Sequence, residues 1–392
     1  METKKKGFPT AFWVCACTEI FERLAYYLGR SLILIFVTAS VATGGLGLSD
    51  TVAANMQSNL TAFSYLLPLF GAVIVDKYIG ARYTTPVGMF IAAAGYFTGG
   101  IAKSSAGVYA MIFLVSLGLA LFKNGAIIGR VITDKSQMDP AFSMRYTLVN
   151  VGAFIGTFLV GILYKDVFAK DGVLGFAPCF KMAALMMVLG GLWYIFVCWR
   201  FLGDLGKLPF KKTLTEEEKA AEAKKKEETG TKQPLTTIEK KRIGAIFVAS
   251  LFSIVFWIFW YLGYMPVYFY WAENMDWVVA GYQVPSTWFD AANSLFCVIL
   301  GPVTAALWKK LAARPQGDMS LFRKTGLGIA IIGVGYLFYA AIDIMRGGEK
   351  ASVLWLIVFA FLLTMGEMFF SPLGHSFISK YSPSRYLAVM MS

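Results

Sequence analysis

Residues 18–30 read TEIFERLAYYLGR and place four charged side chains and two tyrosines inside a segment that is otherwise apolar. In an α-helix each residue is rotated by about 100° from the one before it, so these polar positions share one face. A charged side chain that faces lipid is costly, whereas one that faces protein or a water-filled cavity finds a partner there. We therefore expect this face to organise the functional site. It spans an arc of roughly 140° and holds Glu19, Glu22, Arg23, Tyr26, Tyr27 and Arg30.

The composition predicts an all-α polytopic membrane protein. Apolar residues make up 57% of the chain, charged residues only 15%, and the mean hydropathy is +0.61, which is too apolar for a soluble protein of this length. The net charge of +12 does not indicate a nucleic-acid partner, because an excess of Lys and Arg in membrane proteins marks the cytoplasmic loops. The five cysteines lack the spacing of a metal site or a disulfide framework.

Ten apolar runs are long enough to cross about 30 Å of hydrocarbon as helices. We predict helices over residues 9–42, 51–75, 83–102, 107–129, 143–164, 177–202, 243–271, 285–312, 322–345 and 352–380.

The loops between these segments differ in charge. Loops on the side of the N-terminus carry the excess of Lys and Arg, as in residues 130–145 and 200–242, whereas those on the other side are short or mixed. The positive-inside rule therefore predicts a multi-pass protein of the cell membrane (inner or plasma membrane) with its N-terminus in the cytoplasm.

The predicted helices fall into two groups. Residues 1–202 form a six-helix N-terminal bundle, residues 203–242 a charged cytoplasmic linker rich in Glu, Lys and Ala, and residues 243–392 a C-terminal bundle of about four helices. The sequence ends at LAVMMS (387–392), which resembles the opening of another apolar helix. We expect a chain truncated before its last two helices, with a ten-helix form as the alternative.

The loop after the second predicted helix contains glycines and charged residues in a distinctive order. Residues 71–82 read GAVIVDKYIGAR, which resembles the signature of the major facilitator superfamily. In that fold two helical bundles rock around a substrate that lies between them near the membrane midplane.

Further motifs narrow the resemblance to the proton-dependent oligopeptide transporter (POT/PTR) family. Glu19-x-x-Glu22-Arg23 with Tyr26-Tyr27 resembles the family's first-helix motif, with Leu24 in place of a phenylalanine. The remaining matches follow in chain order: YLLPL (65–69), FKN (122–124, where the family has F-K-P), YTLVNVGA (146–153), STWFDAAN (286–293) and GEMFFSPLG (366–374).

The resemblance implies a proton-coupled symporter that imports di- and tripeptides by alternating access. A peptide is a zwitterion, so Arg and Lys suit its carboxylate, Glu suits its ammonium, and Asn suits the amide between them. The implied substrate-binding residues are Arg23, Tyr26, Tyr27, Arg30, Tyr65, Lys123, Asn150, Trp288, Asn293 and Glu367. The implied proton-coupling residues are Glu19, Glu22, Arg23 and Asp290. Protons are the coupling ion, so we expect no cofactor and no metal; the expected partners are small peptides and the lipid bilayer, and the chain is expected to act as a monomer.

One position departs from the family pattern. The family has a glutamate in its seventh helix, which is implicated in proton coupling and in a gate with the arginine matched by Arg30. Tyr261 stands at that position here. Arg30 therefore has no obvious partner, unless Asp290, which stands where the family's eighth helix has a glutamine, takes the place of that acid.

Several of these residues have structural alternatives. A tyrosine or tryptophan in a membrane helix can serve in packing alone, and a mid-helix asparagine can bond a neighbouring helix. Two other functions also stay open: transport of another small anion or zwitterion, and a transport-inactive sensor or remnant. An enzyme is not expected, because no nucleophile–base pair, metal cluster or phosphate-binding loop is present.

Overall fold

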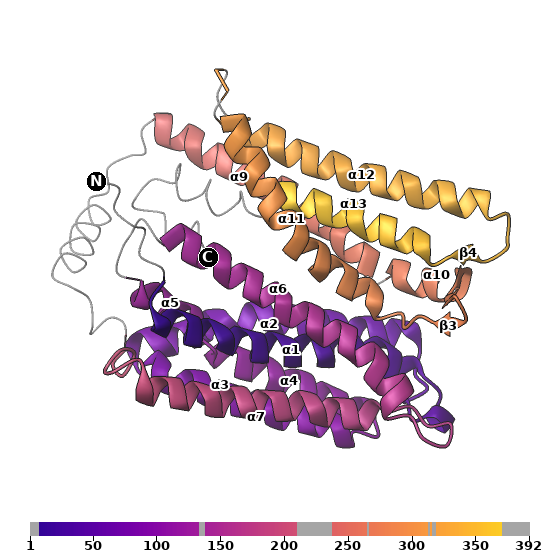
Figure 1. Cartoon of the computed structure of the whole chain (residues 1–392), viewed down its shortest axis with the longest axis horizontal. Helices are drawn as coiled ribbons and strands as arrows, with labels where there is room; N and C mark the ends of the chain where they lie inside the picture. The colour runs from indigo at the N-terminus through magenta and orange to yellow at the C-terminus, as the bar shows by residue number, and fades with distance from the viewer. Residues whose placement is uncertain are drawn as a thin grey trace. The chain divides into compact units, whose positions relative to one another are not determined.

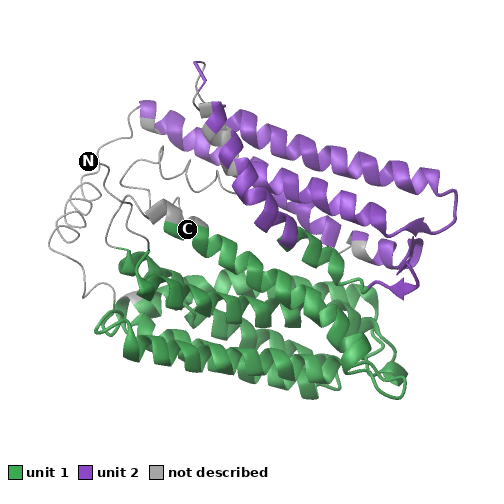
Figure 2. Cartoon of the chain, in the orientation of Figure 1, with its two compact units in different colours: residues 1–213, 285–294 green, residues 214–284, 295–392 purple. Residues whose placement is uncertain are grey.

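The computed structural model describes residues 8–132, 138–209, 237–264, 266–312, 314–315 and 319–370. The chain is all-α apart from four strands of two residues each within these ranges (Figure 1), which confirms the predicted fold class. It divides into two compact units (Figure 2). Unit 1 comprises residues 1–213 and 285–294, and unit 2 comprises residues 214–284 and 295–392.

In its described residues unit 1 contains nine helical elements and the start of a later helix, α11. The elements are α1 (Thr10–Thr38), the 3-10 helix η1 (Val41–Thr43), α2 (Asp50–Lys77), α3 (Ala81–Ile101), α4 (Ser105–Leu121), α5 (Asn124–Val131), α6 (Met138–Ile162), the short π-helix η3 (Leu163–Val167) and α7 (Phe176–Arg200).

Unit 2 contains the remaining helices and all four short strands. The elements are α9 (Thr237–Tyr264), α10 (Pro266–Asn274), β1 (Met275–Asp276), β2 (Val278–Val279), β3 (Tyr282–Gln283), α11 (Trp288–Ala312), α12 (Leu321–Met345), β4 (Ala351–Ser352) and α13 (Leu354–Phe370). Most of the predicted linker, residues 210–236, lies outside the described residues, and residues 237–242 already belong to α9.

One helix predicted as continuous is interrupted within the described residues. The segment 107–129 breaks at Phe122 and Lys123, where the backbone N–H of Lys123 donates to Thr85 Oγ1 of α3 at 3.3 Å. A hydrogen bond to another helix thus takes the place of the one within the helix. In the segment 243–271, α9 ends at Tyr264 and α10 begins at Pro266, on either side of Met265, which lies outside the described residues.

Small residues allow the helices of unit 1 to pack closely. Gly152 and Gly156 of α6 lie one turn apart against α1, and a Cβ at Gly156 would lie 2.5 Å from the carbonyl oxygen of Leu24. Gly88 of α3 and Gly118 of α4 face each other's backbone in the same way. Close approach through small residues is the usual means by which membrane helices associate. On α6 it brings polar side chains against the polar face of α1.

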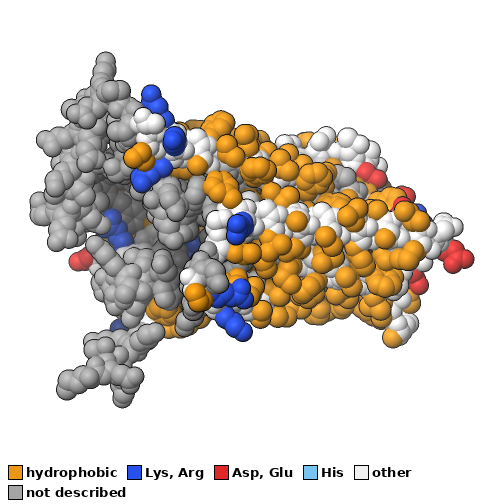
Figure 3. Space-filling view, turned by 90° about the horizontal axis from the view of Figure 1, so that it is seen from above, with side chains coloured by type: hydrophobic (Ala, Val, Ile, Leu, Met, Phe, Trp, Pro, Cys, Tyr) orange, Lys and Arg blue, Asp and Glu red, His pale blue; other side chains and the backbone are white. Residues whose placement is uncertain are grey.

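Six helical segments of the described chain are long and apolar enough to cross a membrane. α1 is not among them, because it carries four charged side chains. The outward faces are apolar as well: Figure 3 shows hydrophobic side chains covering one face between its ends, where Lys, Arg, Asp and Glu appear. On α9 and α12 the exposed apolar residues include Phe247, Leu251, Val255, Val334 and Leu337. The protein is therefore a multi-pass membrane protein. The six spans are Asp50–Val75, Ser105–Val131, Met144–Val167, Phe176–Arg200, Lys240–Asn274 and Phe322–Met345.

At one end of unit 1, the segment 71–82, which resembles the superfamily signature, joins two helices through Arg82. Arg82 donates one N–H to the carbonyl oxygen of Cys198 at 2.6 Å and another to that of Gly203. A guanidinium in this place satisfies carbonyl groups at the C-terminal end of α7, which have no partner within the helix. The loop thus links the start of α3 to the end of α7. The side chain of Asp76, the acidic residue of the signature, lies outside the described part of the chain.

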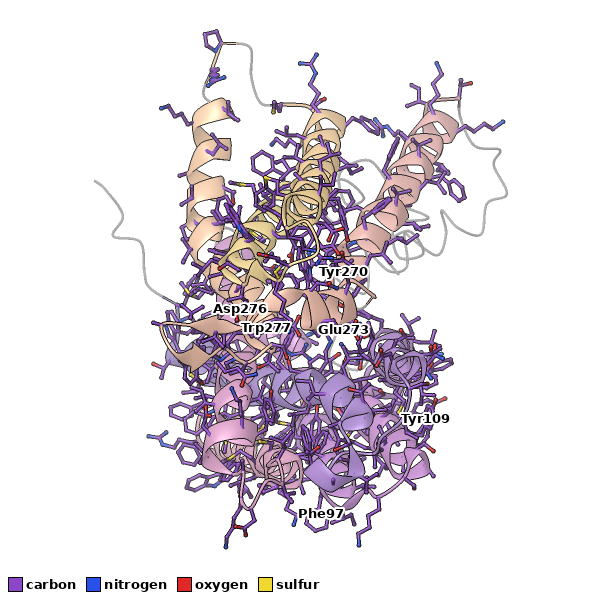
Figure 4. All side chains as sticks on the ribbon, turned by 90° about the vertical axis from the view of Figure 1, so that its right-hand side faces the viewer. Phe97, Tyr109, Tyr270, Glu273, Asp276 and Trp277 are labelled. Carbon is purple, nitrogen blue, oxygen red and sulfur yellow. The ribbon has the colours of Figure 1, made fainter. Side chains whose placement is uncertain are left out.

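One end of unit 2 is closed by polar contacts between loops. β1 pairs with β4 in parallel, and Tyr270 of α10 donates to Asp343 of α12. Arg346 completes the group, because it donates to Asp343 Oδ1 at 2.6 Å and to Tyr270 Oη at 2.9 Å. Figure 4 labels Tyr270 and Glu273 on α10, together with Asp276 and Trp277 directly after it. These contacts join α10 to α12.

Candidate functional site

Most of the polar face of α1 is buried in unit 1, and Arg23 and Tyr27 on this face are half-buried. Glu19 is 1% exposed, Glu22 is 0% exposed, and Tyr26 and Arg30 are also buried. Burial of this face follows from the helices packed on α1, with α6 at Gly152 and Gly156 and α5 at the buried Asn124. A buried charge is costly unless a partner compensates it. The partners therefore decide what each carboxylate can do.

Glu22 pairs with its sequence neighbour. The Nη2 of Arg23 donates to Glu22 Oε1 at 2.6 Å, and the Nε of Arg23 donates to Oε2, so that the contact is bidentate. The carboxylate is buried, whereas the guanidinium side chain is 25% exposed. Arg23 also lies over the ring of Tyr26, with 4.8 Å from its Cζ to the ring centroid. Its cation therefore has a carboxylate on one side and an aromatic face on the other.

Glu19 is held by two residues that the sequence analysis does not include in the site. Arg145 Nε of α6 donates to Glu19 Oε1 at 2.9 Å, and Asn124 Nδ2 of α5 donates to the same oxygen at 3.0 Å. Asn124 also donates to the carbonyl oxygen of Cys15 at 2.9 Å. Glu19 thus joins α1, α5 and α6. A signal for Asn124 was present, since it stands where the family motif has a proline, which could donate no such hydrogen bond.

Lys123 lies at the break between α4 and α5. Its Nζ donates to the carbonyl oxygen of Pro68 in α2 at 2.9 Å. The ammonium group is thus directed toward α2 by the broken backbone, and in the structure it bonds a main-chain oxygen.

Arg30 and Tyr27 continue the polar face along α1. Arg30 lies over the ring of Tyr27 at 5.8 Å, and the rings of Tyr26 and Tyr27 meet edge to face at 5.3 Å. Asp290, at the start of α11, interacts electrostatically with Arg30. Tyr65 of α2 is 72% exposed.

Two predicted substrate contacts make structural contacts. Asn150 Nδ2 donates to the carbonyl oxygen of Tyr146 in its own helix at 3.0 Å. Trp288 stacks on Phe158 at 4.6 Å and donates from Nε1 to the carbonyl oxygen of Phe158 at 3.1 Å. Asn293 lies half-buried on the first turns of α11.

In unit 2 the predicted acid is buried. Glu367 of α13 is 7% exposed, and its Oε2 accepts a hydrogen bond from Trp260 Nε1 of α9 at 3.1 Å. Tyr261 follows directly on α9, with its ring 5.1 Å from that of Trp260. No group of three or more His, Cys, Asp and Glu side chains in the described part of the chain is arranged to hold a metal ion.

Comparisons with known proteins agree with this arrangement of helices. A family model described as the POT family matches residues 204–392. The uncharacterized transporter YclF of Bacillus subtilis is 25% identical over 98% of this chain and 84% of its own length. A di-/tripeptide transporter of Lactococcus lactis subsp. cremoris is 24% identical over 98% of this chain and 86% of its own.

Among solved structures, a crystal structure of a peptide transporter POT in complex with sulfate superposes with a TM-score of 0.85 at 24% identity. The match covers 99% of this chain and 86% of that one. The fold is therefore that of the major facilitator type, and the relatives span nearly the whole chain. The buried Glu19 and Glu22 of the motif on α1 and the POT family model that matches residues 204–392 together make the chain similar to the POT family of transporters.

Proposed function

We propose that the protein imports di- and tripeptides together with protons by alternating access. The observation that carries this proposal is the bidentate contact on α1 between the buried carboxylate of Glu22 and the guanidinium of Arg23, whose side chain is 25% exposed. A cation that is already paired with a carboxylate cannot bind a second carboxylate equally well. Protonation of Glu22 removes that competition and leaves Arg23 to receive the carboxylate of the peptide. Proton binding and peptide binding then favour each other, as symport requires.

The two carboxylates have different tasks in this mechanism. Glu19 is tied to Asn124 and Arg145 on two other helices, so it supports the packing of unit 1. Among the described residues Glu22 has its hydrogen bonds from Arg23, which lies beside it on the same helix, and it can exchange this partner without separating helices. Release of the proton on the cytoplasmic side restores the pair and expels the peptide carboxylate.

The substrate assignment rests on charges in the two units. Arg23, Arg30 and Lys123 supply a cationic pole in unit 1, and Glu367 supplies a buried carboxylate in unit 2. A peptide zwitterion has the complementary carboxylate and ammonium groups. Relatives that are peptide transporters, among them the di-/tripeptide transporter of Lactococcus lactis, support peptides over other zwitterions. The transporter works as a monomer in the cell membrane, with the proton as its coupling ion and no cofactor.

Tyr261 favours one alternative, a protein that binds substrate without proton-driven transport. It stands on α9 where the family has an acid, and its side chain has no carboxylate that could pair with an arginine. Asp290 interacts with Arg30, so in the proposed mechanism this acid takes the place of the missing one.

The test is uptake of a labelled dipeptide into proteoliposomes under an imposed pH gradient, combined with counterflow in the absence of a gradient. Proton-coupled transport predicts accumulation above equilibrium that a protonophore abolishes. Counterflow without accumulation would show an uncoupled carrier, and binding without either would show a sensor. Asp204→Asn is a matched control, because this exposed carboxylate pairs only with Lys207 in the described structure and lies outside the spans.

A further inference from the structure

In unit 2, α9 and α13 run antiparallel and meet at three successive levels. Phe256 stacks on Phe370 with ring centroids 4.0 Å apart. Two turns further along α9, Gly263 lies so close to α13 that a Cβ there would be 2.9 Å from Leu363 Cδ1. Between these apolar contacts, Trp260 donates its indole N–H to Glu367. The hydrogen bond between Trp260 and Glu367 therefore has an apolar contact between α9 and α13 on each side of it.

The indole of Trp260 is held by its own helix. Its ring lies 4.5 Å from that of Tyr264, 5.1 Å from that of Tyr261 and 5.5 Å from that of Trp257. Packing on three aromatic neighbours restricts the rotation of the side chain. The direction of the N–H group is thus set by α9, and this group can only donate a hydrogen bond.

Glu367 is the only buried carboxylate that unit 2 has in its described residues. A buried carboxylate needs hydrogen bonds to offset the loss of water, and a bond from a rigid donor also fixes its orientation. An acid that must meet a substrate ammonium in one geometry gains from such a fixed orientation.

We infer that Trp260 is a positioning residue for Glu367, which sets the orientation in which this carboxylate receives the amino group of the substrate. The inference rests on the proposed function, in which Glu367 binds the peptide ammonium. In this arrangement α9 takes part in substrate recognition through a hydrogen-bond donor, the indole N–H of Trp260, and not through a charged side chain. Trp260 acts through Glu367 and needs no contact with the peptide.

The inference is tested with Trp260→Phe, which keeps an aromatic ring and removes the N–H. The measurement is the Kd of Ala-Ala and of N-acetyl-Ala-Ala in the wild type, in Trp260→Phe, in Glu367→Gln and in the double variant. We expect Trp260→Phe to raise the Kd of Ala-Ala about tenfold, the size typical of a lost hydrogen bond to a charged group. N-acetyl-Ala-Ala, which has no ammonium, should be affected little. In the Glu367→Gln background Trp260→Phe should add no further loss.

The outcomes separate the two proposals. Equal losses for both peptides, or additive losses in the double variant, would overturn the positioning role while leaving peptide binding intact. A wild type that binds neither peptide would instead overturn the proposed function, and this inference with it. Trp355→Phe is the matched control, since Trp355 lies on the same helix as Glu367 but packs on Phe338 at 5.8 Å. Folding of Trp260→Phe is checked by the indole ¹⁵N resonances, of which one should disappear and the others should keep their shifts.

Discussion

Glu19 and Glu22 lie one helical turn apart on α1, yet their surroundings differ. Glu19 receives hydrogen bonds from α5 and α6, whereas Glu22 receives them from Arg23 on its own helix. A side chain that ties three helices together cannot change partners without loosening their packing. A side chain paired on its own helix can. The two carboxylates should therefore respond differently to the same substitution.

Glu22→Gln should remove proton coupling and spare the fold. With an amide in place of the carboxylate, ΔpH-driven accumulation should fall to the equilibrium level, while peptide counterflow persists because it needs no net proton movement. Both are measured in proteoliposomes. Accumulation against the gradient in this variant would show that the coupling site lies elsewhere.

Glu19→Gln should lower the free energy of unfolding. The change leaves the guanidinium of Arg145 without its carboxylate, and the loss should be about 1–3 kcal/mol. Thermal unfolding in detergent should show a lower Tm than for Glu22→Gln, with accumulation and counterflow reduced together. An unchanged Tm with a selective loss of accumulation would reverse the two assignments.

Lys123→Ala should abolish gradient-driven uptake, because it removes one cation from the pole that receives the substrate carboxylate. Lys103, an exposed residue between α3 and α4, provides the control in Lys103→Ala. If Lys123→Ala transports at the wild-type rate at equal expression, Lys123 does not bind the substrate and has a structural role, such as its hydrogen bond to Pro68.

At the scale of elements, the packing of α6 on α1 decides whether Arg145 reaches Glu19. Gly156 lets the two backbones approach, and so the ion pair depends on a residue that carries no functional group.

Gly156→Val should therefore destabilise the protein, since the added side chain meets the carbonyl oxygen of Leu24. Overpacking of this kind costs about 1–3 kcal/mol and should lower the Tm by several degrees. Gly333→Val on α12 is the matched control, because nothing lies within 4 Å of a Cβ at that position. Equal shifts for the two variants would contradict close packing at α1 and α6.

For the whole molecule, orientation follows from loop charge. The positive-inside rule predicts that the N-terminus and the turn after α7 lie in the cytoplasm and that the loop between η3 and α7 lies outside. In a variant that lacks the natural cysteines, Lys170→Cys should react with a membrane-impermeant maleimide in intact cells, whereas Lys207→Cys should react only after permeabilisation. The reverse pattern would invert the direction of transport in the proposed mechanism.

The sequence alone determined the class of protein and the polar face of α1, because both depend on composition and on the 3.6-residue period within one segment. It also predicted the family, through short motifs that need no tertiary contact to be recognised. The helix boundaries were predicted to within a few residues where apolar runs end at charged loops. They were wrong at Lys123, where the broken backbone depends on Thr85 of another helix.

Only the tertiary structure decided which groups meet. Arg145 and Asn124 reach Glu19 from helices far along the chain, and Trp260 reaches Glu367 across 107 residues. Such pairs are set by the distance and rotation of packed helices, which glycines and aromatic side chains determine jointly. No periodicity within one segment reports that geometry, so the sequence could identify the charged residues but could not assign their partners.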